Sequence, residues 1–333
     1  MPLGRVLVEK FKPETIEWLA ARAEVVVVDP WAEPERWDRE APQVDAVISR
    51  KGRITRAHME KSRGRLKIVA RTGVGVDASR IDVDAAKEHK VWVTNRPGVN
   101  AAAVAELTLA QMVALARHTH VANRAVKDGR WSEYGRLIGV ELAGKTVGIV
   151  GMGNIGTRVA LRARAFEMQL LVSDPYIPAS HVTALGGRWV RLDELLGEAD
   201  FVTLHCPHNK ETHHMIGAPQ LARMRPSAYL VNLARGGVVD EEALYRVLSE
   251  RKIAGAAIDV LETEPPRKDH PLLELDNVLW SPHIGGSTGE ATDRGERGAA
   301  EEVVRVLQGE RPENPVFELK TSDSAARHRP AAE

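Results

Sequence analysis

Three ionisable side chains, Arg235, Glu264 and His283, each follow a short apolar run in the second half of the sequence. The planar fork of an arginine can hold a carboxylate. A histidine titrates near neutral pH and can give or take a proton on oxygen. A glutamate hydrogen-bonded to that ring would orient it and favour its protonated form. These residue types suit hydride transfer at a carbon that bears an oxygen, next to a carboxylate.

Each of these residues also has an ordinary structural interpretation. An arginine after a strand is usually a surface ion-pair partner, a glutamate in Glu-Thr-Glu-Pro is usually solvated, and a histidine beside Gly-Gly is often a structural hydrogen bonder. Their joint occurrence after three strands favours catalysis, because the carboxyl ends of parallel strands share one edge of a sheet. Flanking glycines are expected to let the backbone come close to a ligand: Gly236, Gly237, Gly285 and Gly286.

A glycine-rich turn precedes these residues, within Thr146–Gly156. We expect Gly151 to permit the turn out of a strand and Gly153 to let the backbone approach a pyrophosphate. Gly156 would let the next helix pack close to the sheet. The N-terminus of that helix offers free N–H groups to phosphates. The pattern predicts a dinucleotide site, with a turn in some other doubly wound fold as the alternative.

An acidic residue completes this pattern. Asp174 ends a second apolar run, Leu170–Asp174, and can accept hydrogen bonds from a ribose 2′-hydroxyl. It would repel a 2′-phosphate, and the following Pro175 and Tyr176 offer no cation. The sequence therefore predicts NAD as the cofactor rather than NADP.

Short apolar runs alternate with polar helical stretches on both sides of the turn, which predicts an α/β fold with two doubly wound, Rossmann-like domains and parallel sheets. The early strands are expected at Val6–Val8, Glu24–Val28, Ala46–Ser49, Leu66–Ala70 and Val91–Thr94. The later ones are expected at Leu170–Ser173, Phe201–His205, Tyr229–Leu233, Ala254–Ile258 and Val278–Trp280. Helices are expected over Ala101–Lys127, over Asp240–Ser249 with Asp240 as N-cap, and over Thr288–Leu307.

Composition excludes several classes of partner. Lys and Arg together number 46, as do Asp and Glu, so no net charge suggests nucleic acid or an anionic membrane. The single Cys206 excludes an internal disulfide framework and fits a reducing compartment. No apolar run approaches the roughly 18 residues that cross a bilayer, and the N-terminal apolar run is too brief for a signal sequence. We expect a cytoplasmic protein that acts on a small molecule.

One segment crowds metal-ligating residue types: His205, Cys206, His208, His213 and His214. We set a metal site aside, because Pro207 interrupts any helical ligand spacing and neither a CxxC nor an HExxH pattern accompanies it.

The sequence resembles the D-2-hydroxyacid dehydrogenases, and within them the short 3-phosphoglycerate dehydrogenases, from about residue 3 to Phe317. The motifs that carry the resemblance are Arg71–Asp77, Asn95–Asn100, Val104–Glu106, Gly151–Gly156, His205–Pro207 with Thr212, Asn232–Gly237, Asp259–Pro265 and Ser281–Gly285. The resemblance implies NAD-dependent interconversion of a D-2-hydroxy acid and its 2-oxo acid. 3-Phosphoglycerate, the precursor of serine biosynthesis, is the leading substrate, and glyoxylate or hydroxypyruvate is the first alternative.

The resemblance also assigns site residues. It implies that Arg235, Glu264 and His283 are catalytic. It implies cofactor contacts at Gly151, Gly153, Asn154, Ile155, Gly156, Asp174, Pro207, Thr212, Ala234, Arg235, Asp259, His283 and Gly285. It implies substrate contacts at Ser49, Arg50, Arg71, Gly73, Val74, Gly75, Arg235 and His283.

The family implies a cofactor domain inserted into a discontinuous substrate domain, and a homodimer built around the region after Ala101. The expected bounds are 1–100 plus 290–318 for a flavodoxin-like substrate domain and 101–289 for the NAD domain, with 319–333 as a disordered tail. Two departures bear on the substrate. A simple alignment puts Ser49, with Arg50 adjacent, at a position where phosphoglycerate enzymes often carry arginine, while Arg71 matches a second basic position. No regulatory domain is expected after the last helix. An NAD(H)-sensing corepressor-like scaffold is the alternative of another class.

Overall fold

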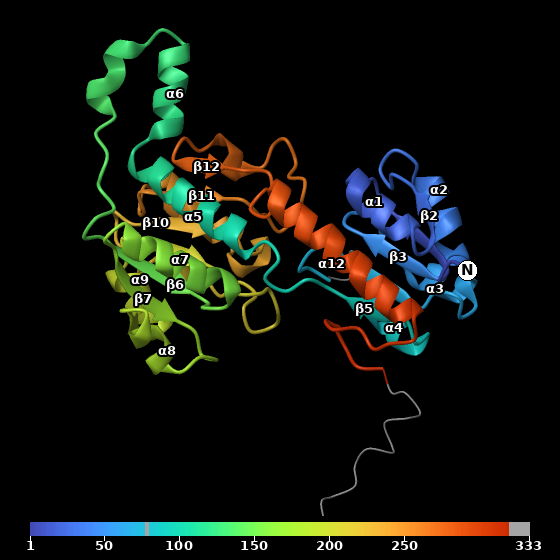
Figure 1. The fold of residues 1–333 in the computed structure, drawn as a ribbon. Helices are drawn as coiled ribbons and strands as arrows, with labels where there is room; N and C mark the ends of the chain where they lie inside the picture. Colours follow the sequence, from blue (N-terminus) through green and yellow to red (C-terminus); the bar gives the residue numbers. More distant parts are fainter. Residues whose placement is uncertain (77–79, 320–333) are drawn as a thin grey trace, which may run out of the picture. The chain divides into compact units, whose positions relative to one another are not determined.

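The chain forms two compact units in the computed structural model, which describes residues 1–76 and 80–319 (Figure 1). Unit 1 comprises Met1–Val99 with the chain from Thr288 onward, and unit 2 comprises Asn100–Ser287. Asp77, which follows the predicted substrate loop Arg71–Val76, and the predicted tail beyond Leu319 lie outside the described residues.

Unit 1 is built on a five-stranded parallel sheet in the order β2-β1-β3-β4-β5. Its strands are β1 (Arg5–Val8), β2 (Glu24–Val27), β3 (Ala46–Ser49), β4 (Ile68–Arg71) and β5 (Trp92–Thr94). Its helices are α1 (Pro13–Ala20), α2 (Pro34–Glu40), η1 (Ala41–Gln43), α3 (Arg56–Ser62), α4 (Val83–Glu88) and α12 (Gly289–Leu307). The alternation of strands and helices forces parallel pairing, because each crossover returns the chain to the same edge.

Each face of the unit 1 sheet buries its own apolar core. Leu7 packs with Trp37 and Met59 on one face, while its neighbours Val6 and Val8 pack with Leu19 and α12 on the other. This period of two is the strand repeat that lets both faces of a parallel sheet be covered. The last helix of the chain thus completes the core that the first strand begins.

Unit 2 contains a seven-stranded parallel sheet in the order β12-β11-β10-β9-β6-β7-β8. Its strands are β6 (Thr146–Val150), β7 (Gln169–Ser173), β8 (Arg188–Trp189), β9 (Phe201–Leu204), β10 (Tyr229–Asn232), β11 (Gly255–Ile258) and β12 (Val278–Trp280). Its α-helices are α5 (Ala101–Ala116), α6 (Thr119–Lys127), α7 (Asn154–Ala165), α8 (Ala179–Ala184), α9 (Leu192–Glu198), α10 (Ala218–Leu221) and α11 (Glu241–Ser249). Short 3-10 helices are η2 (Trp131–Arg136), η3 (Gly236–Val238) and η4 (Pro271–Glu274).

Helices cover both faces of this sheet as well. α5 and α7 lie side by side on one face and share a core with β6, whereas α9, α10 and α11 pack on the other (Figure 1). The predicted N-cap of α11 is confirmed, since the Asp240 carboxylate accepts the Ala243 N–H at 3.0 Å. The α/β fold with doubly wound parallel sheets agrees with the expectation from sequence.

The expected single helix over Ala101–Lys127 is wrong. α5 ends at Ala116 and α6 begins at Thr119, because His118 adopts a left-handed backbone with φ of 49°. A non-glycine residue rarely takes that conformation, and it turns the chain away from the helix axis. α6 and the turn that follows it project from the sheet (Figure 1). Large apolar side chains remain exposed along this segment, including Trp131 at 72% and Ile138 at 83%.

Within the described chain, no helix has both the length and the apolar character that a membrane crossing requires.

Candidate active site

The predicted cofactor and catalytic residues of unit 2 gather at the carboxyl edge of its sheet. The glycine-rich turn follows β6, near the middle of the strand order, and Asp174 follows the neighbouring β7. Arg235, Asp259 and His283 follow β10, β11 and β12, on the other side of β6. Residues spread over more than 130 positions of sequence therefore share one edge because the strands are parallel.

The glycines of the turn have different neighbours. Gly151 has φ of +89°, and a Cβ on it would lie 2.8 Å from the Cys206 nitrogen. A Cβ on Gly156 would lie 2.2 Å from the Gly151 carbonyl oxygen, so the start of α7 packs tightly against the turn. A Cβ on Gly153 would meet no described atom within 4 Å. Gly153 is thus the position where the backbone is open to a phosphate, at the N-terminus of α7.

Asp174, the predicted ribose-binding residue, supports the backbone of the turn. Its Oδ2 accepts the Met152 N–H at 2.7 Å, and its Oδ1 accepts the Tyr176 N–H at 2.8 Å. The Tyr176 hydroxyl donates in turn to the Glu211 carboxylate, and this bond raises the pKa of Tyr176. A second carboxylate, that of Glu211, therefore contacts the side chain of Tyr176, two residues after Asp174. Sequence reasoning assigned Asp174 to the ribose and missed its bond to the turn.

The loop after β9 brings Pro207 and Thr212 together, because the Thr212 hydroxyl donates to the Pro207 carbonyl at 2.6 Å. Two groups in this loop are held uncharged at neutral pH. Burial lowers the pKa of His205 to about 3, and burial raises the pKa of the Cys206 thiol to about 11. His205 also contacts the Thr203 hydroxyl at 2.9 Å, which makes it a structural residue behind the loop.

The histidines that follow form a small cluster near this edge. His208 contacts His213 through ring nitrogens 3.1 Å apart, His213 stacks on His214, and His214 bonds Glu262 at 2.8 Å. Among the described residues no group of three or more His, Cys, Asp or Glu side chains has the arrangement that holds a metal ion.

Asn232 fixes the backbone around Arg235. Its side-chain oxygen accepts the Ala234 N–H at 3.0 Å, and its amide nitrogen donates to the Arg235 carbonyl at 3.1 Å. The Arg235 guanidinium donates to the Ala234 carbonyl at 2.7 Å. A Cβ on Gly236 would lie 1.9 Å from the Leu261 carbonyl carbon. Asn232 is a positioning residue that lay within a family motif but received no role from sequence reasoning.

Glu264 and His283 form the hydrogen bond on which the predicted role of Glu264 depends. His283 Nδ1 lies 2.6 Å from Glu264 Oε2, and the Leu261 N–H donates to Glu264 Oε1 at 3.1 Å. The side chains are 51% and 37% exposed, so the pair faces solvent rather than the core. Because the carboxylate accepts from Nδ1, His283 Nε2 is left to face a ligand.

This pair shifts both acid–base equilibria. The hydrogen bond that His283 donates to the Glu264 carboxylate raises the pKa of His283, and burial opposes this shift. Burial opposes ionisation of Glu264, but the bond and charge of His283 outweigh it and lower the pKa of Glu264. Both shifts favour the charged forms of the pair, an imidazolium beside a carboxylate.

Asp259 holds the loop that carries His283. Its side chain is 3% exposed, and its carboxylate accepts the backbone N–H groups of Ile284 at 2.9 Å and Gly285 at 2.8 Å. The Asp259 carbonyl accepts the His283 N–H at 2.8 Å.

The glycines expected to approach a ligand contact the protein instead. A Cβ on Gly236, Gly237, Gly285 or Gly286 would come within 3.0 Å of Leu261, His208, Asp259 or Asn100 respectively. Their small size lets loops of unit 2 pack against one another. Packing within unit 2 is thus a sufficient reason for glycine at these positions, and their close approach to a ligand stays a prediction.

Unit 1 brings several predicted substrate residues together. The Arg71 guanidinium donates to the Ser49 hydroxyl at 3.2 Å and to the Gly75 carbonyl at 3.3 Å, and Arg71 is 7% exposed. The Gly73 carbonyl accepts the Arg96 N–H and the Val74 carbonyl accepts from the Asn95 side-chain amide, so the segment just after β5 fixes this loop. The Arg50 guanidinium instead lies 4.0 Å from the Glu296 carboxylate.

A carboxylate that the sequence did not single out organises the loop after β3. Glu9 follows β1 and is 4% exposed. Its Oε1 accepts the N–H groups of Arg50, Lys51 and Gly52 at 2.7, 2.6 and 2.7 Å, and it also contacts the Ser49 hydroxyl at 3.1 Å. Three consecutive backbone N–H groups form an anion-binding nest, and here a side chain of the protein occupies it.

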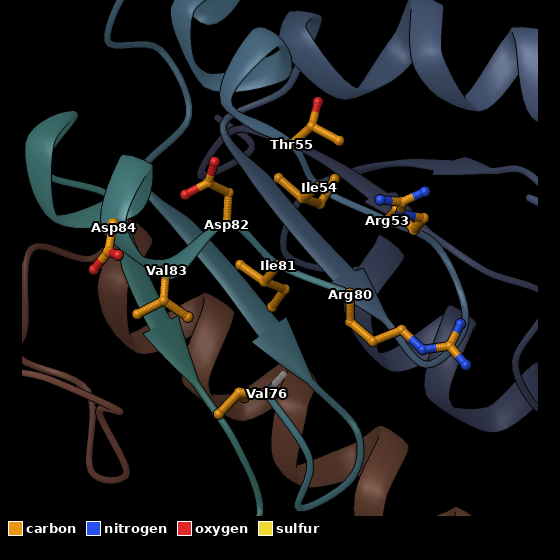
Figure 2. Close-up of a pocket in the computed structure, with 9 residues that line it drawn as sticks. All are labelled: Arg53, Ile54, Thr55, Val76, Arg80, Ile81, Asp82, Val83 and Asp84. Carbon is orange, nitrogen blue, oxygen red and sulfur yellow. The ribbon is translucent and has the colours of Figure 1, made fainter. Parts of the chain in front are cut away.

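A cavity of about 450 Å³ lies in unit 1, with Arg53 and Arg80 on one side and Asp82 and Asp84 on the other (Figure 2). Its remaining lining residues are Ile54, Thr55, Val76, Ile81 and Val83. None of the predicted catalytic or substrate residues lines it, although Val76 ends the predicted substrate loop. We therefore infer nothing about the reaction from this cavity.

A family model described as the NAD-binding domain of D-isomer-specific 2-hydroxyacid dehydrogenases matches residues 109–285, which contain the turn, Arg235, Glu264 and His283. The chain belongs to the D-isomer-specific 2-hydroxyacid dehydrogenase family. The cofactor of its unit 2 is accordingly a nicotinamide dinucleotide, and the open backbone at Gly153 beside the N-terminus of α7 fits that group.

Named relatives fall into two groups. The chain is 46% identical over 274 residues to D-3-phosphoglycerate dehydrogenase of Methanocaldococcus jannaschii, which covers 82% of this chain and 51% of that protein. It is 42% identical over 283 residues to hydroxypyruvate reductase of Thermotoga maritima, covering 84% and 90%. The chain thus spans about half the length of the phosphoglycerate dehydrogenases that it matches.

Solved structures agree with this fold. The TT0316 protein of Thermus thermophilus superimposes with a TM-score of 0.85 at 36% identity, covering 94% of this chain and 100% of that one.

Proposed function

We propose that this protein is an NAD-dependent oxidoreductase that interconverts a D-2-hydroxy acid and its 2-oxo acid. The observation that carries the proposal is the 2.6 Å contact between His283 and Glu264 at the sheet edge that also holds the glycine-rich turn. In this proposal unit 2 binds the cofactor and unit 1 provides the substrate domain.

The proposed roles follow from the chemistry of the side chains. Arg235 holds the substrate carboxylate with its fork. For reduction, the protonated His283 ring donates from Nε2 to the carbonyl oxygen, while Glu264 stabilises the imidazolium through Nδ1. For oxidation the neutral ring accepts that proton. The nicotinamide ring, when bound, supplies or takes up the hydride.

NAD rather than NADP is the proposed cofactor. The carboxylate of Asp174 opposes a 2′-phosphate.

3-Phosphoglycerate is the leading substrate, because several relatives bear the name D-3-phosphoglycerate dehydrogenase. Hydroxypyruvate or glyoxylate is the second candidate, and an observation in unit 1 favours it. Ser49 is fully buried at a position where phosphoglycerate enzymes often carry arginine, and Glu9 already occupies the loop N–H groups beside it.

Initial rates with NADH and a panel of 2-oxo acids test the proposal, with 3-phosphohydroxypyruvate, hydroxypyruvate and glyoxylate included. We expect turnover with at least one of them, and the ratio of kcat/KM values then selects the substrate. Tight binding of NADH without turnover on the whole panel would favour the corepressor-like scaffold instead.

A homodimer and a cytoplasmic location complete the proposal. Exposed Trp131 and Ile138 lie on the segment after α5, where the family resemblance puts the partner. Sedimentation of the purified protein measures the oligomeric state.

A further inference from the structure

His283 occupies an unusual backbone conformation. Its φ of 52° lies in the left-handed region, which non-glycine residues seldom adopt, although asparagine, aspartate and histidine do so more often than the others. Such a conformation persists only when its surroundings impose it. Asp259 supplies part of that constraint through the N–H groups of Ile284 and Gly285.

The constraint continues beyond Asp259. The Ser281 hydroxyl donates to Asp259 Oδ1, and the Gln111 side-chain amide donates to the Ser281 oxygen at 2.8 Å. Gln111 is in α5, 170 residues earlier in the sequence. A continuous series of hydrogen bonds therefore runs from α5 to the loop of His283.

The direction of each bond follows from the groups involved. The Asp259 carboxylate accepts only, so it takes the single hydroxyl proton of Ser281. The Ser281 oxygen is then an acceptor, and only the NH₂ end of the Gln111 amide can satisfy it. This requirement fixes the amide orientation of Gln111.

Gln111 differs from the other buried residues of α5. It is 4% exposed, and its neighbours on the buried side of the helix are mostly apolar. Its Oε1 atom is buried without a hydrogen-bond partner among the described residues. Thr108 is also buried, but its hydroxyl donates to the Val104 carbonyl of the same helix at 2.8 Å. A buried amide oxygen without a partner costs free energy. The bond that the NH₂ end of Gln111 makes to Ser281 must therefore offset this cost.

We propose that Gln111 is a positioning residue for catalysis, which acts through Ser281 and Asp259 to hold His283 in its orientation toward the substrate and Glu264. This inference rests on the proposed role of His283. Loss of the Gln111 donor frees the Ser281 hydroxyl to rotate, weakens its bond to Asp259, and lets the loop relax toward an ordinary backbone conformation. His283 then spends less time against Glu264.

The test compares Gln111→Met, which keeps the length of the side chain and removes the donor, with Thr108→Val as a control on the same helix. We expect Gln111→Met to lower kcat about tenfold, a fraction of the roughly 10²-fold that a 1 Å misplacement can cost. NADH affinity should stay within about threefold, which is a difference of under 0.7 kcal/mol. Thr108→Val should leave kcat unchanged.

The pH profile separates positioning from general destabilisation. If His283 loses part of its contact with Glu264, its pKa falls, so the alkaline limb of the reduction rate moves to lower pH. Ser281→Ala should reproduce the shift, Ser281→Thr should restore the normal profile, and the double variant Gln111→Met/Ser281→Ala should lose no more than the larger single loss.

Ser281→Ala removes one oxygen only and remains informative if Gln111→Met folds poorly. The inference is overturned if both variants lower thermal stability while kcat and the pH profile stay normal. An active His283→Asn enzyme would instead overturn the proposed function itself, so the two failures are distinguishable.

Discussion

The same architectural edge is used differently in the two units. At the carboxyl edge of the unit 1 sheet, Glu9 satisfies three loop N–H groups and Arg71 is buried against Ser49. At the carboxyl edge of the unit 2 sheet, Gly153 is open to its surroundings and the His283–Glu264 pair is largely exposed. Both edges are made by parallel strands with crossover helices.

The difference teaches that strand topology gathers polar groups without deciding their use. Buried groups at an edge must be paired within the protein, which makes them structural. Exposed groups that are paired only on their inner side keep donors and acceptors for a ligand. Substitutions of the exposed pair at the unit 2 edge should therefore act on turnover, and substitution of a buried carboxylate paired within the protein, such as Glu9 at the unit 1 edge, should act mainly on stability.

The largest effect is expected for His283→Asn. Asparagine cannot transfer a proton near neutral pH, so kcat should fall by about 10²–10⁴-fold while NADH binding persists. Stopped-flow turnover and NADH fluorescence titration measure the two quantities. Near-normal turnover would refute the catalytic role of His283. It would also mean that the exposed pair at the unit 2 edge has no special part in turnover.

Arg235→Lys should come next. The ammonium group keeps the charge but loses the planar fork that matches a carboxylate, so kcat/KM should fall about 10²-fold. Steady-state kinetics with the best substrate of the panel measures this loss. An unchanged kcat/KM would count against carboxylate binding at Arg235.

Glu264→Gln should change the pH dependence most clearly. The native carboxylate raises the pKa of His283, so the imidazolium needed for reduction is present below that pKa and is lost as pH rises through it. In the variant the pKa of His283 falls, and the alkaline limb of the reduction rate moves to lower pH. A profile identical to the native one would show that the pair does not set this ionisation.

Asp174→Asn tests the predicted preference for NAD over NADP at the unit 2 edge. The amide oxygen can still accept one backbone N–H, so the turn should survive, but the charge that repels a 2′-phosphate is gone. The ratio of kcat/KM for NADPH to that for NADH should rise about five- to tenfold, or roughly 1–1.4 kcal/mol. A native enzyme that already prefers NADPH would contradict the ribose argument.

The smallest effect is expected for Glu9→Gln in unit 1. The variant keeps an acceptor but replaces charge-assisted bonds with neutral ones, so the free energy of unfolding should drop by about 1 kcal/mol. Denaturant unfolding measures this change, and kcat should stay normal. A tenfold loss of kcat without loss of stability would mean that the unit 1 edge takes part in turnover.

Sequence was sufficient for the fold class and for the location of the predicted catalytic residues at one sheet edge. The alternation of apolar runs with helical stretches predicts a parallel sheet, and the carboxyl ends of parallel strands lie at one edge. The strand ends therefore predicted where Arg235, Glu264 and His283 would gather. The catalytic roles remain predictions until they are measured. The break between α5 and α6 was not predictable, since His118 carries none of the glycine or proline signals that usually end a helix. The short β8 was missed because its two residues, Arg188 and Trp189, are both exposed.

Contacts between distant polar residues lay further beyond sequence reasoning. Glu9 meets the loop after β3 across 41–43 positions, and Gln111 meets Ser281 across 170. Neither pairing follows from local periodicity, because each depends on how a strand or helix is placed in three dimensions.

The discontinuity of unit 1 has a consequence for the order of folding during synthesis. Val6, Val8 and Leu19 share their core with Ala299 and Val303 of α12, so this core lacks one wall until the last helix has left the ribosome. Unit 2 is continuous in sequence and holds all its strands before that point. The cofactor-binding half can therefore mature first, while the other half waits for its closing helix.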